Sequence, residues 1–385
     1  MSRVSIASEA ISAAWQASLE RVDAEFLVAQ DEHRFPEPFV QASRRWLLSV
    51  GKVAIPMHRG ARQRLGPLER ELVVAPRGAE PVEGWDFITF ADHPQPSMGS
   101  VAAGRALMAF ADDAAAQPDV SVYALVSGGA SSLCEVPVDG LSLETLTRLN
   151  RQDMAAGLSI DVFNRRRAQR SAIKGGKLAG RFGPTLLGAS VVVDIPSGRP
   201  EIVGSGLLAL DGLPLQSLAT PRTLGQTFAS ELRSRGWSPQ LQPPVDAPME
   251  EVLACVALWR PTARVGAVWL AAGEIRVPVP THALGHNGGR ARHAALSLAM
   301  ACKAEESVGQ GRWLVFAAAS DGCDGVGGAG ALIGCDVLDG TIADDAQRAL
   351  QNFRSGDFCA DHGMMLKAHS SRTNLCDVYA VARIG

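Results

Sequence analysis

The sequence contains no apolar run long enough to cross a membrane, and its beginning lacks the uncharged apolar core of a secretory signal. Acidic residues stand where such a signal would be apolar: Glu9, Glu20, Asp23 and Glu25. We therefore expect a cytoplasmic protein without a membrane partner.

Paired cysteines are absent as well. The seven cysteines form no C-x-x-C pair and no Cys/His cluster at the spacing of a zinc site. We expect reduced and mostly buried thiols, because nothing in their spacing points to metal binding.

A strong excess of charge of one sign is also missing. The chain has 37 lysines and arginines against 40 acidic residues, a formal net charge of −3. Proteins that hold nucleic acid need a basic surface to neutralise phosphates, so nucleic acid is not an expected partner. What the chain does have is 46% apolar and 20% charged residues over 385 positions, which is typical of a globular protein with two domains.

Short apolar segments alternate with longer amphipathic segments along the chain. The predicted strands are Trp46–Val50, Glu71–Ala75, Phe87–Phe90, Val120–Val126, Leu186–Val193, Val265–Ala271, Trp313–Ala318 and Cys376–Ala382. The predicted helices are Val101–Ala114, Leu143–Ala156, Arg222–Arg235, Ala291–Cys302 and Asp344–Asn352. This alternation predicts an α/β fold with doubly wound layers, in which ligands bind beyond the carboxyl ends of the strands.

The segment Gly236–Pro248 is rich in proline and has no periodicity, so it is the best candidate for a linker. We place the domain boundary there, with an N-terminal α/β domain over residues 1–240 and a smaller C-terminal α/β domain over 241–385.

Two loops that follow predicted strands have the residues of an anion site. Lys52 follows a strand and a glycine in SVGKVA, a position that is either solvated or directed at a bound ligand. The VSGGASS loop, with Ser127, Gly128, Gly129, Ser131 and Ser132, can form a nest of backbone N–H donors with added hydroxyls, although a plain tight turn is the alternative. No GKS or GKT follows, which excludes a P-loop.

Charged residues follow further strands. Asp194 comes after an apolar strand, where it suits either a magnesium ligand or a turn aspartate. Arg290 follows two glycines at the start of a predicted helix, where the helix dipole is already positive, so an arginine there favours an anion-binding role. Asp321 and Asp324 lie three apart in a glycine-rich loop, and can share a divalent cation or divide metal and base roles. The ligand pattern of an EF-hand is missing.

Some patterns carry less information. The basic run Asn164–Arg170 is most often a solvated helix face, but together with Lys174 it can line an anionic site. Glycine strings begin at Gly204 and Gly325, and neither follows a strand directly and opens a helix, as a dinucleotide-binding fingerprint requires. His93 is interpreted as a turn residue near the site.

Taken together, these loops resemble the glycerate 2-kinase family, whose C-terminal part is called the MOFRL domain. The motifs that carry the resemblance occur in the family's order at SVGKVA, ADHPQP, VSGGASS, AIKGGKLA, VVDIPSG, NGGRAR, SDGCDG and RTNLCDV. The resemblance implies a Rossmann-like N-terminal layer, a MOFRL-type C-terminal domain and a cleft between them.

The resemblance also implies an activity: transfer of the ATP γ-phosphoryl group to the 2-hydroxyl of D-glycerate, with Mg²⁺. The family's functional residues fall on Lys52, Arg290, Asp321 and Asn374. Under this hypothesis Lys52 and Arg290 hold the phosphate and the substrate carboxylate, Asp321 activates the hydroxyl or binds Mg²⁺, and Asn374 orients the substrate. The nucleotide is expected on the Ser-Gly-Gly loop, Lys174 and Asp194, and the metal on Asp321 and Asp324.

The chain departs from the family's pattern at three loops. Ser97 replaces an aspartate, Ser197 and Gly198 replace Gly-Asp, and Ala291–His293 replaces Asn-Gln-Glu after the Gly-Gly-Arg motif. We expect the added Arg292 to alter the charge of the cleft and the acceptor. Three alternatives stay open: a kinase of another hydroxy acid or secondary metabolite, a hydroxypyruvate reductase, and a non-catalytic relative. Self-association is also left open.

Overall fold

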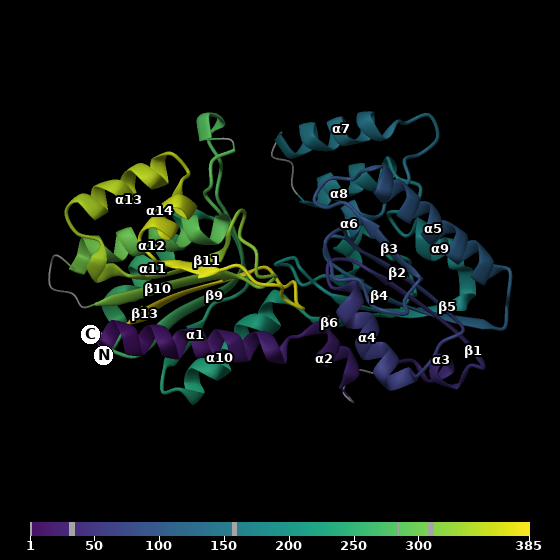
Figure 1. Cartoon of the computed structure of the whole chain (residues 1–385), viewed down its shortest axis with the longest axis horizontal. Helices are drawn as coiled ribbons and strands as arrows, with labels where there is room; N and C mark the ends of the chain where they lie inside the picture. The colour runs from purple at the N-terminus through teal and green to yellow at the C-terminus, as the bar shows by residue number, and fades with distance from the viewer. Residues whose placement is uncertain (1, 31–34, 156–159, 284, 307–311) are drawn as a thin grey trace. The chain divides into compact units, whose positions relative to one another are not determined.

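The structure is a computed structural model that describes residues 2–30, 35–155, 160–283, 285–306 and 312–385. Its described residues form two compact units (Figure 1). One, which we call the parallel-sheet unit, comprises Ala24–Asp194 and Arg199–Leu218. The other, the mixed-sheet unit, comprises Met1–Asp23, Ile195–Gly198 and Ala219–Gly385. Among the helices in these residues, none combines the length and the apolarity that crossing a bilayer requires.

The parallel-sheet unit is built on a sheet with the strand order β3-β2-β1-β4-β5-β6. Its strands are β1 (Arg44–Val50), β2 (Arg70–Pro76), β3 (Ile88–Ala91), β4 (Val120–Ser127), β5 (Leu186–Val192) and β6 (Leu215–Ala219). The pairs along the sheet from β3 to β5 are parallel. This is the order of a doubly wound Rossmann-type sheet, whose topological switch point lies between β1 and β4.

Helices cover this sheet because its strands are apolar on both faces. The central strand β1 is buried from Trp46 to Val50, and α4 packs against β1, β2 and β4. The helices of this unit are α2 (Ala24–Ala29), α3 (Glu37–Gln41), α4 (Ala54–Leu65), α5 (Met98–Ala115), α6 (Ala130–Leu133), α7 (Leu143–Ala155), α8 (Ile160–Gln169) and α9 (Lys177–Phe182). The predicted α/β class and the doubly wound layer are therefore confirmed for this part of the chain.

The mixed-sheet unit contains a sheet with the order β12-β11-β10-β13-β9-β7, and β8 also pairs with β9. Its strands are β7 (Ser238–Leu241), β8 (Val245–Pro248), β9 (Ala267–Arg276), β10 (Trp313–Ala319), β11 (Gly328–Gly334), β12 (Met365–Lys367) and β13 (Asp377–Arg383). The strands from β12 to β9 pair antiparallel, whereas β7 and β8 pair parallel to β9.

Helices lie on both faces of this second sheet. On one face α1 (Arg3–Arg21) packs with α10 (Pro221–Ser234), and Trp15 of α1 makes edge contacts with Phe228 and Phe316. The other helices are α11 (Met249–Trp259), α12 (Arg290–Glu306), α13 (Thr341–Gln351) and α14 (Ser355–Asp361). Figure 1 shows α11 to α14 on the face opposite α1 and α10. The apolar core on that side joins α12 to β10 and β11.

The segment Gly236–Pro248 is not a linker, contrary to the sequence-based expectation. It holds β7 and β8, which pair with β9 through residues 267–276. The compact units also differ from a division at residue 240, because α1 and α10 bury their apolar faces in the mixed-sheet unit. These strands pair with residues that are distant in the sequence, which no local pattern indicates. The prolines in the segment also argued against a strand, because proline cannot donate a hydrogen bond to a neighbouring strand.

Candidate functional site

The carboxyl ends of β1 and β4 are held together through the loops that contain Lys52 and Ser127. The backbone N–H of Lys52 donates to the carbonyl of Gly128 at 2.8 Å, and that of Val53 donates to Ser127 Oγ at 3.2 Å. Gly51 has a φ of +132°, and a Cβ there would lie 2.1 Å from Ser127 Oγ. Only glycine allows this approach, so Gly51 sets the position of Lys52 at the switch point of the sheet.

The Lys52 and His93 side chains flank Gly129. A Cβ on Gly129, whose φ is +83°, would lie 2.9 Å from Lys52 Cγ and 3.3 Å from His93 Cδ2. A side chain at this position would displace both of them. The glycines of the Ser-Gly-Gly loop therefore leave room for a basic side chain and an imidazole at the loop.

The serines of this loop have different roles. Ser132 Oγ donates to the carbonyl of Gly129 at 3.0 Å, and Ser132 and Ser127 are both buried. These contacts hold the loop itself, and the contact of Ser127 and Ser132 with a ligand stays a prediction. Ser131 is only half-buried, and its Oγ accepts from Arg167 at 3.1 Å.

The sequence suggested that Lys174 lines an open anionic site, but the structure places it in the interior. Its ammonium is fully buried in an ion pair with Glu135, which is itself buried. Burial lowers the pKa of Lys174, and the carboxylate of Glu135 opposes that shift. Lys174 therefore supports the interior of the unit and is not positioned to contact a nucleotide directly.

Asp194 lies beyond the end of β5, the strand next to β4. Val192, the last residue of β5, is in register with Ser127, so Asp194 follows the strand at the same edge of the sheet as the Ser-Gly-Gly loop. Asp194 is half-buried. The predicted positions at Lys52, Ser127–Ser132 and Asp194 are thus brought to one edge of the parallel sheet.

A second set of predicted residues gathers at one end of the mixed sheet. Arg290 begins α12, and its Nε donates to Asp377 Oδ2 at 2.8 Å. Another guanidinium nitrogen of Arg290 pairs with Glu274 of β9. The two carboxylates explain why an arginine is stable at a helix N-terminus. Burial disfavours the charged form of Arg290, but Asp377 and Glu274 outweigh it and raise the pKa of the guanidinium.

Asp377 is buried and also accepts a hydrogen bond from the hydroxyl of Tyr379 at 2.9 Å. Burial raises the pKa of Asp377 to about 6, and the guanidinium of Arg290 opposes the shift. Neither Asp377 nor Glu274 is predicted from the sequence as a partner of Arg290. Asp377 is the aspartate of the RTNLCDV motif, and its place in that motif is the signal in the sequence that points to it.

Asp321 and Asn374 lie next to this cluster. Asp377 pairs with Ala319 across β13 and β10, and the loops beyond that pair carry Asn374 and Asp321. Ser320 joins the loops, since its Oγ accepts from the N–H of Leu375 at 2.7 Å and its N–H donates to the carbonyl of Cys376 at 2.9 Å. The strand register therefore brings Arg290, Asp321 and Asn374 to the same end of the sheet.

Asp324 is a structural residue of the α12 N-terminus. Its Oδ1 accepts from the N–H of Ala291 at 3.1 Å, and its Oδ2 accepts from the N–H of Arg292 at 2.8 Å and from Arg292 Nε at 3.1 Å. The side chain of Arg292 is fully buried. Arg292 therefore adds no charge to an open surface, contrary to what its position in a divergent motif suggested.

The proposed metal pair of Asp321 and Asp324 does not fit a Mg²⁺ site. The Asp324 oxygens already accept three N–H donors, whereas a metal ligand must direct lone pairs at the ion. Asp321 Oδ1 accepts from the N–H of Cys323 at 3.1 Å. Among the residues that the structure describes, no three His, Cys, Asp or Glu side chains are grouped to hold a metal.

Ser97, which stands where the resembled family has an aspartate, caps α5. Its Oγ accepts from the N–H of Gly99 at 3.0 Å and donates to Asp92 Oδ2 at 2.5 Å. The hydroxyl of Ser97 is the main cause that lowers the pKa of Asp92, with Arg77 second. A carboxylate thus remains next to this loop, at position 92.

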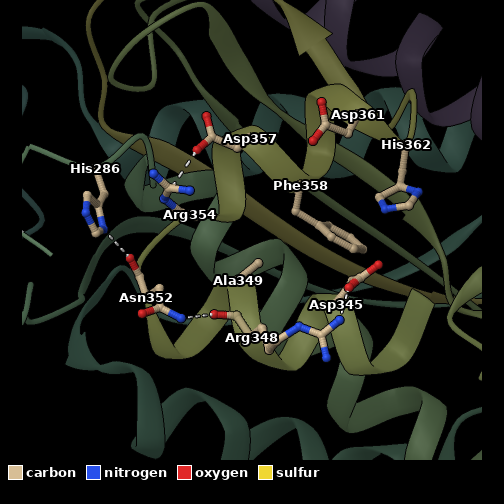
Figure 2. Close-up of a pocket in the computed structure, with 10 residues that line it drawn as sticks. All are labelled: His286, Asp345, Arg348, Ala349, Asn352, Arg354, Asp357, Phe358, Asp361 and His362. Atoms are coloured by element: carbon tan, nitrogen blue, oxygen red, sulfur yellow. Dashed lines mark hydrogen bonds and ion pairs between the residues drawn. The ribbon is translucent and has the colours of Figure 1, made fainter. Parts of the chain in front are cut away.

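A surface hollow of about 490 Å³ lies on α13 and α14, apart from these residues (Figure 2). Its lining residues are His286, Asp345, Arg348, Ala349, Asn352, Arg354, Asp357, Phe358, Asp361 and His362. Arg348 pairs with Asp345, and Arg354 lies 3.8 Å from Asp357. None of the residues predicted for the site lines this hollow.

Two family models match the chain. The model described as Domain of unknown function (DUF4147) matches residues 10–220, more than half of the chain, and the MOFRL family model matches residues 267–377. The chain is therefore a protein of the DUF4147 type with a MOFRL region. This combination confirms the resemblance seen in the loop motifs, and the chain belongs to the glycerate 2-kinase family.

The curated relatives include proteins named as kinases and proteins named as putative reductases. The D-glycerate 2-kinase of Thermotoga maritima is 30% identical over 199 residues, which cover 49% of this chain and 47% of that protein. A putative hydroxypyruvate reductase of Agrobacterium vitis is 37% identical over 116 residues, 30% of each chain. The chain spans about half or less of the length of the curated relatives that it matches.

Solved structures have the same fold over almost the whole chain. The crystal structure of glycerate kinase from Thermotoga maritima has a TM-score of 0.79 at 23% identity and covers 99% of both chains. A Pyrococcus horikoshii protein has a TM-score of 0.72 at 19% identity, and the match covers 97% of this chain and 98% of that one. At these identities the likeness establishes the fold, including the MOFRL-type C-terminal domain.

Proposed function

We propose that this chain transfers the γ-phosphoryl group of ATP to the hydroxyl of a small hydroxy acid, with D-glycerate as acceptor and 2-phosphoglycerate as product. The observation that carries the proposal is the contact of Lys52 with the Ser-Gly-Gly loop at the switch point of the parallel sheet. Phosphate groups bind at such points in doubly wound sheets. Membership of the glycerate 2-kinase family supports the same reaction.

Phosphoryl transfer needs neutralisation of charge and in-line positioning more than covalent chemistry. The ammonium of Lys52 and the N–H groups around Gly128 and Gly129 supply positive charge for phosphoryl oxygens. Mg²⁺ comes to the reaction bound to the phosphates of ATP, and we assign it no ligand among Asp321 and Asp324. The residues of this loop therefore bind the nucleotide, and Asp194 at the same sheet edge is kept as a further contact.

The residues at the end of the mixed sheet are proposed to handle the acceptor. Arg290 has a partly exposed guanidinium whose orientation is set by Asp377 and Glu274, so it can bind the acceptor's carboxylate with a fixed geometry. Asp321 is the proposed base for the reacting hydroxyl, and Asn374 the residue that orients the substrate. One set of residues is thus proposed to bind the phosphates, and the other to bind the acceptor.

Reduction of hydroxypyruvate is the second candidate, because two matching relatives are named putative hydroxypyruvate reductase. The glycine strings give it no support. The string from Gly325 runs into the strand β11, and the string from Gly204 begins within a 3-10 helix. A dinucleotide fingerprint instead lies between a strand and a helix.

Turnover by the purified chain separates these functions. Incubation with MgATP and a panel of hydroxy acids should release ADP with D-glycerate as the best acceptor, and phosphorus NMR should identify the 2-phospho product. A better rate with another hydroxy acid would change the acceptor and keep the reaction. Oxidation of NADH or NADPH by hydroxypyruvate without ADP release would replace the kinase by a reductase, and no turnover in either assay would favour a non-catalytic relative.

A further inference from the structure

Arg167 of α8 is hydrogen-bonded to the Ser-Gly-Gly loop at Ser131. One guanidinium nitrogen donates to Ser131 Oγ at 3.1 Å, and the other donates to the Ser131 carbonyl at 2.9 Å. Phe163 lies against the guanidinium, and Arg167 Cζ is 5.3 Å from the centroid of the Phe163 ring. Two bonds to one residue and an aromatic neighbour restrict the guanidinium to a single orientation.

This contact determines what the Ser131 hydroxyl can do. A guanidinium has only donors, so Ser131 Oγ must be the acceptor in the bond to Arg167. The hydroxyl hydrogen is then directed away from Arg167, and Ser131 is only half-buried. Within the described part of the chain, Oγ donates this hydrogen to no other residue. The positive charge of Arg167 also strengthens the hydroxyl as a donor.

Two basic groups near the loop share one carboxylate. Lys174 and Arg167 lie close enough to Glu135 for all three groups to influence one another, which places two cations against one carboxylate. Lys174 and Glu135 are buried, and burial lowers the pKa of both cations. Arg167 Nε is buried as well and has no hydrogen-bond acceptor among the described residues. An anion bound at the loop would favour the charged forms of these two basic groups, whose pKa values burial lowers.

We propose that Arg167 is a positioning residue, which acts through Ser131 by holding its hydroxyl as a donor to an oxyanion of the substrate. This inference rests on the proposed function and deepens it. The oxyanion belongs either to a phosphoryl group of the nucleotide or to the carboxylate of the hydroxy acid, and both present the same acceptor to Ser131.

The test combines binding and kinetics of S131A, R167Q, R167K and the double variant S131A/R167Q. R181Q is the control, because Arg181 is on the surface of α9 in an ion pair with Asp112. Calorimetric titration with MgATP and with D-glycerate, together with KM for each, shows which compound carries the oxyanion. We expect S131A and R167Q to weaken binding of the same compound by about tenfold or more. R167K should recover part of the loss, and the double variant should be no worse than R167Q.

Other outcomes would overturn the proposal. One is that S131A and R167Q weaken the binding of different compounds. Another is that the fold loss of affinity in the double variant equals the product of the losses in the two single variants. A third is that R167Q has a lower melting temperature but binds both compounds as well as R181Q does. Because S131A removes only a half-buried hydroxyl, it tests the idea even where R167Q fails to fold. If the wild type binds either compound but phosphorylates no hydroxy acid, the proposed function fails while the pattern among these variants still decides the role of Arg167. If the wild type binds neither compound, both proposals fail.

Discussion

Arg292 and Asp324 form a fully buried ion pair, with 3.1 Å between Arg292 Nε and Asp324 Oδ2. The same guanidinium donates to the carbonyl of Val326 at 3.1 Å. A buried carboxylate that loses its partner remains desolvated and uncompensated. We therefore expect R292M to lower the free energy of unfolding by about 3–5 kcal/mol in urea denaturation.

The matched control for this prediction is R276M. Arg276 pairs with Asp246 at 3.0 Å, and both side chains are more than half exposed, so its loss should cost less than about 1 kcal/mol. The double variant R292M/D324N should recover part of the stability, because it removes the unpaired charge. A loss in R292M no larger than that in R276M would contradict the buried role of this pair.

Lys52 is expected to contribute to turnover. Its backbone N–H holds the loop, so K52M keeps that bond while it removes the ammonium. Loss of the positive charge proposed to bind a phosphoryl group should lower kcat/KM for MgATP by about 100-fold or more. K367M, which removes an exposed lysine from the edge strand β12, should keep wild-type kinetics. Full activity in K52M would exclude the phosphate-binding role.

Arg290 is expected to determine affinity for the hydroxy acid. R290K keeps a positive charge near Asp377 and Glu274 but loses the planar fork that binds a carboxylate with two parallel bonds. The KM for D-glycerate should rise by about 10-fold or more, while the KM for MgATP stays close to that of the wild type. Steady-state kinetics with each substrate varied in turn measure both values. An equal rise in both would assign Arg290 to the general structure of the site.

His293 should make stability depend on pH. Burial lowers the pKa of His293 to about 4, with the charge of Asp324 opposing the shift, whereas the unfolded chain has the ordinary value near 6.5. The imidazole is neutral in the fold, where its Nδ1 lies 3.1 Å from Ser355 Oγ and its ring stacks on Phe353. The unfolded state binds a proton first as the pH falls, so this contribution is present above pH 6.5 and is lost towards pH 4.

The measurement compares the wild type with H293N by thermal unfolding between pH 7 and pH 4. The difference between the two curves should shrink by an amount on the order of 3 kcal/mol at most. Taking the difference also removes the opposite effect of Asp377. Its raised pKa, near 6, makes stability fall as the pH rises through the interval from about 4 to 6. Parallel curves for the wild type and H293N would show that His293 is not held neutral.

The sequence by itself determined the features that depend on neighbours along the chain. Apolar runs such as residues 120–126 and 313–318 predicted strands β4 and β10, because a buried strand needs continuous apolar residues. Amphipathic segments predicted α5, α10 and α12 for the same kind of local reason. The glycines beside Lys52 and Ser127 also marked two loops at strand ends as candidate anion sites.

Only the tertiary structure decided which of the candidate residues are buried in ion pairs. Lys174 and Arg292 are basic residues in polar motifs, and both proved to be buried with carboxylates that lie 39 and 32 positions away. The proline-rich segment with β7 and β8 became part of a sheet because β9 was available to pair with it. Burial, strand register and ion pairing are set by residues distant in sequence, so no local pattern could reveal them.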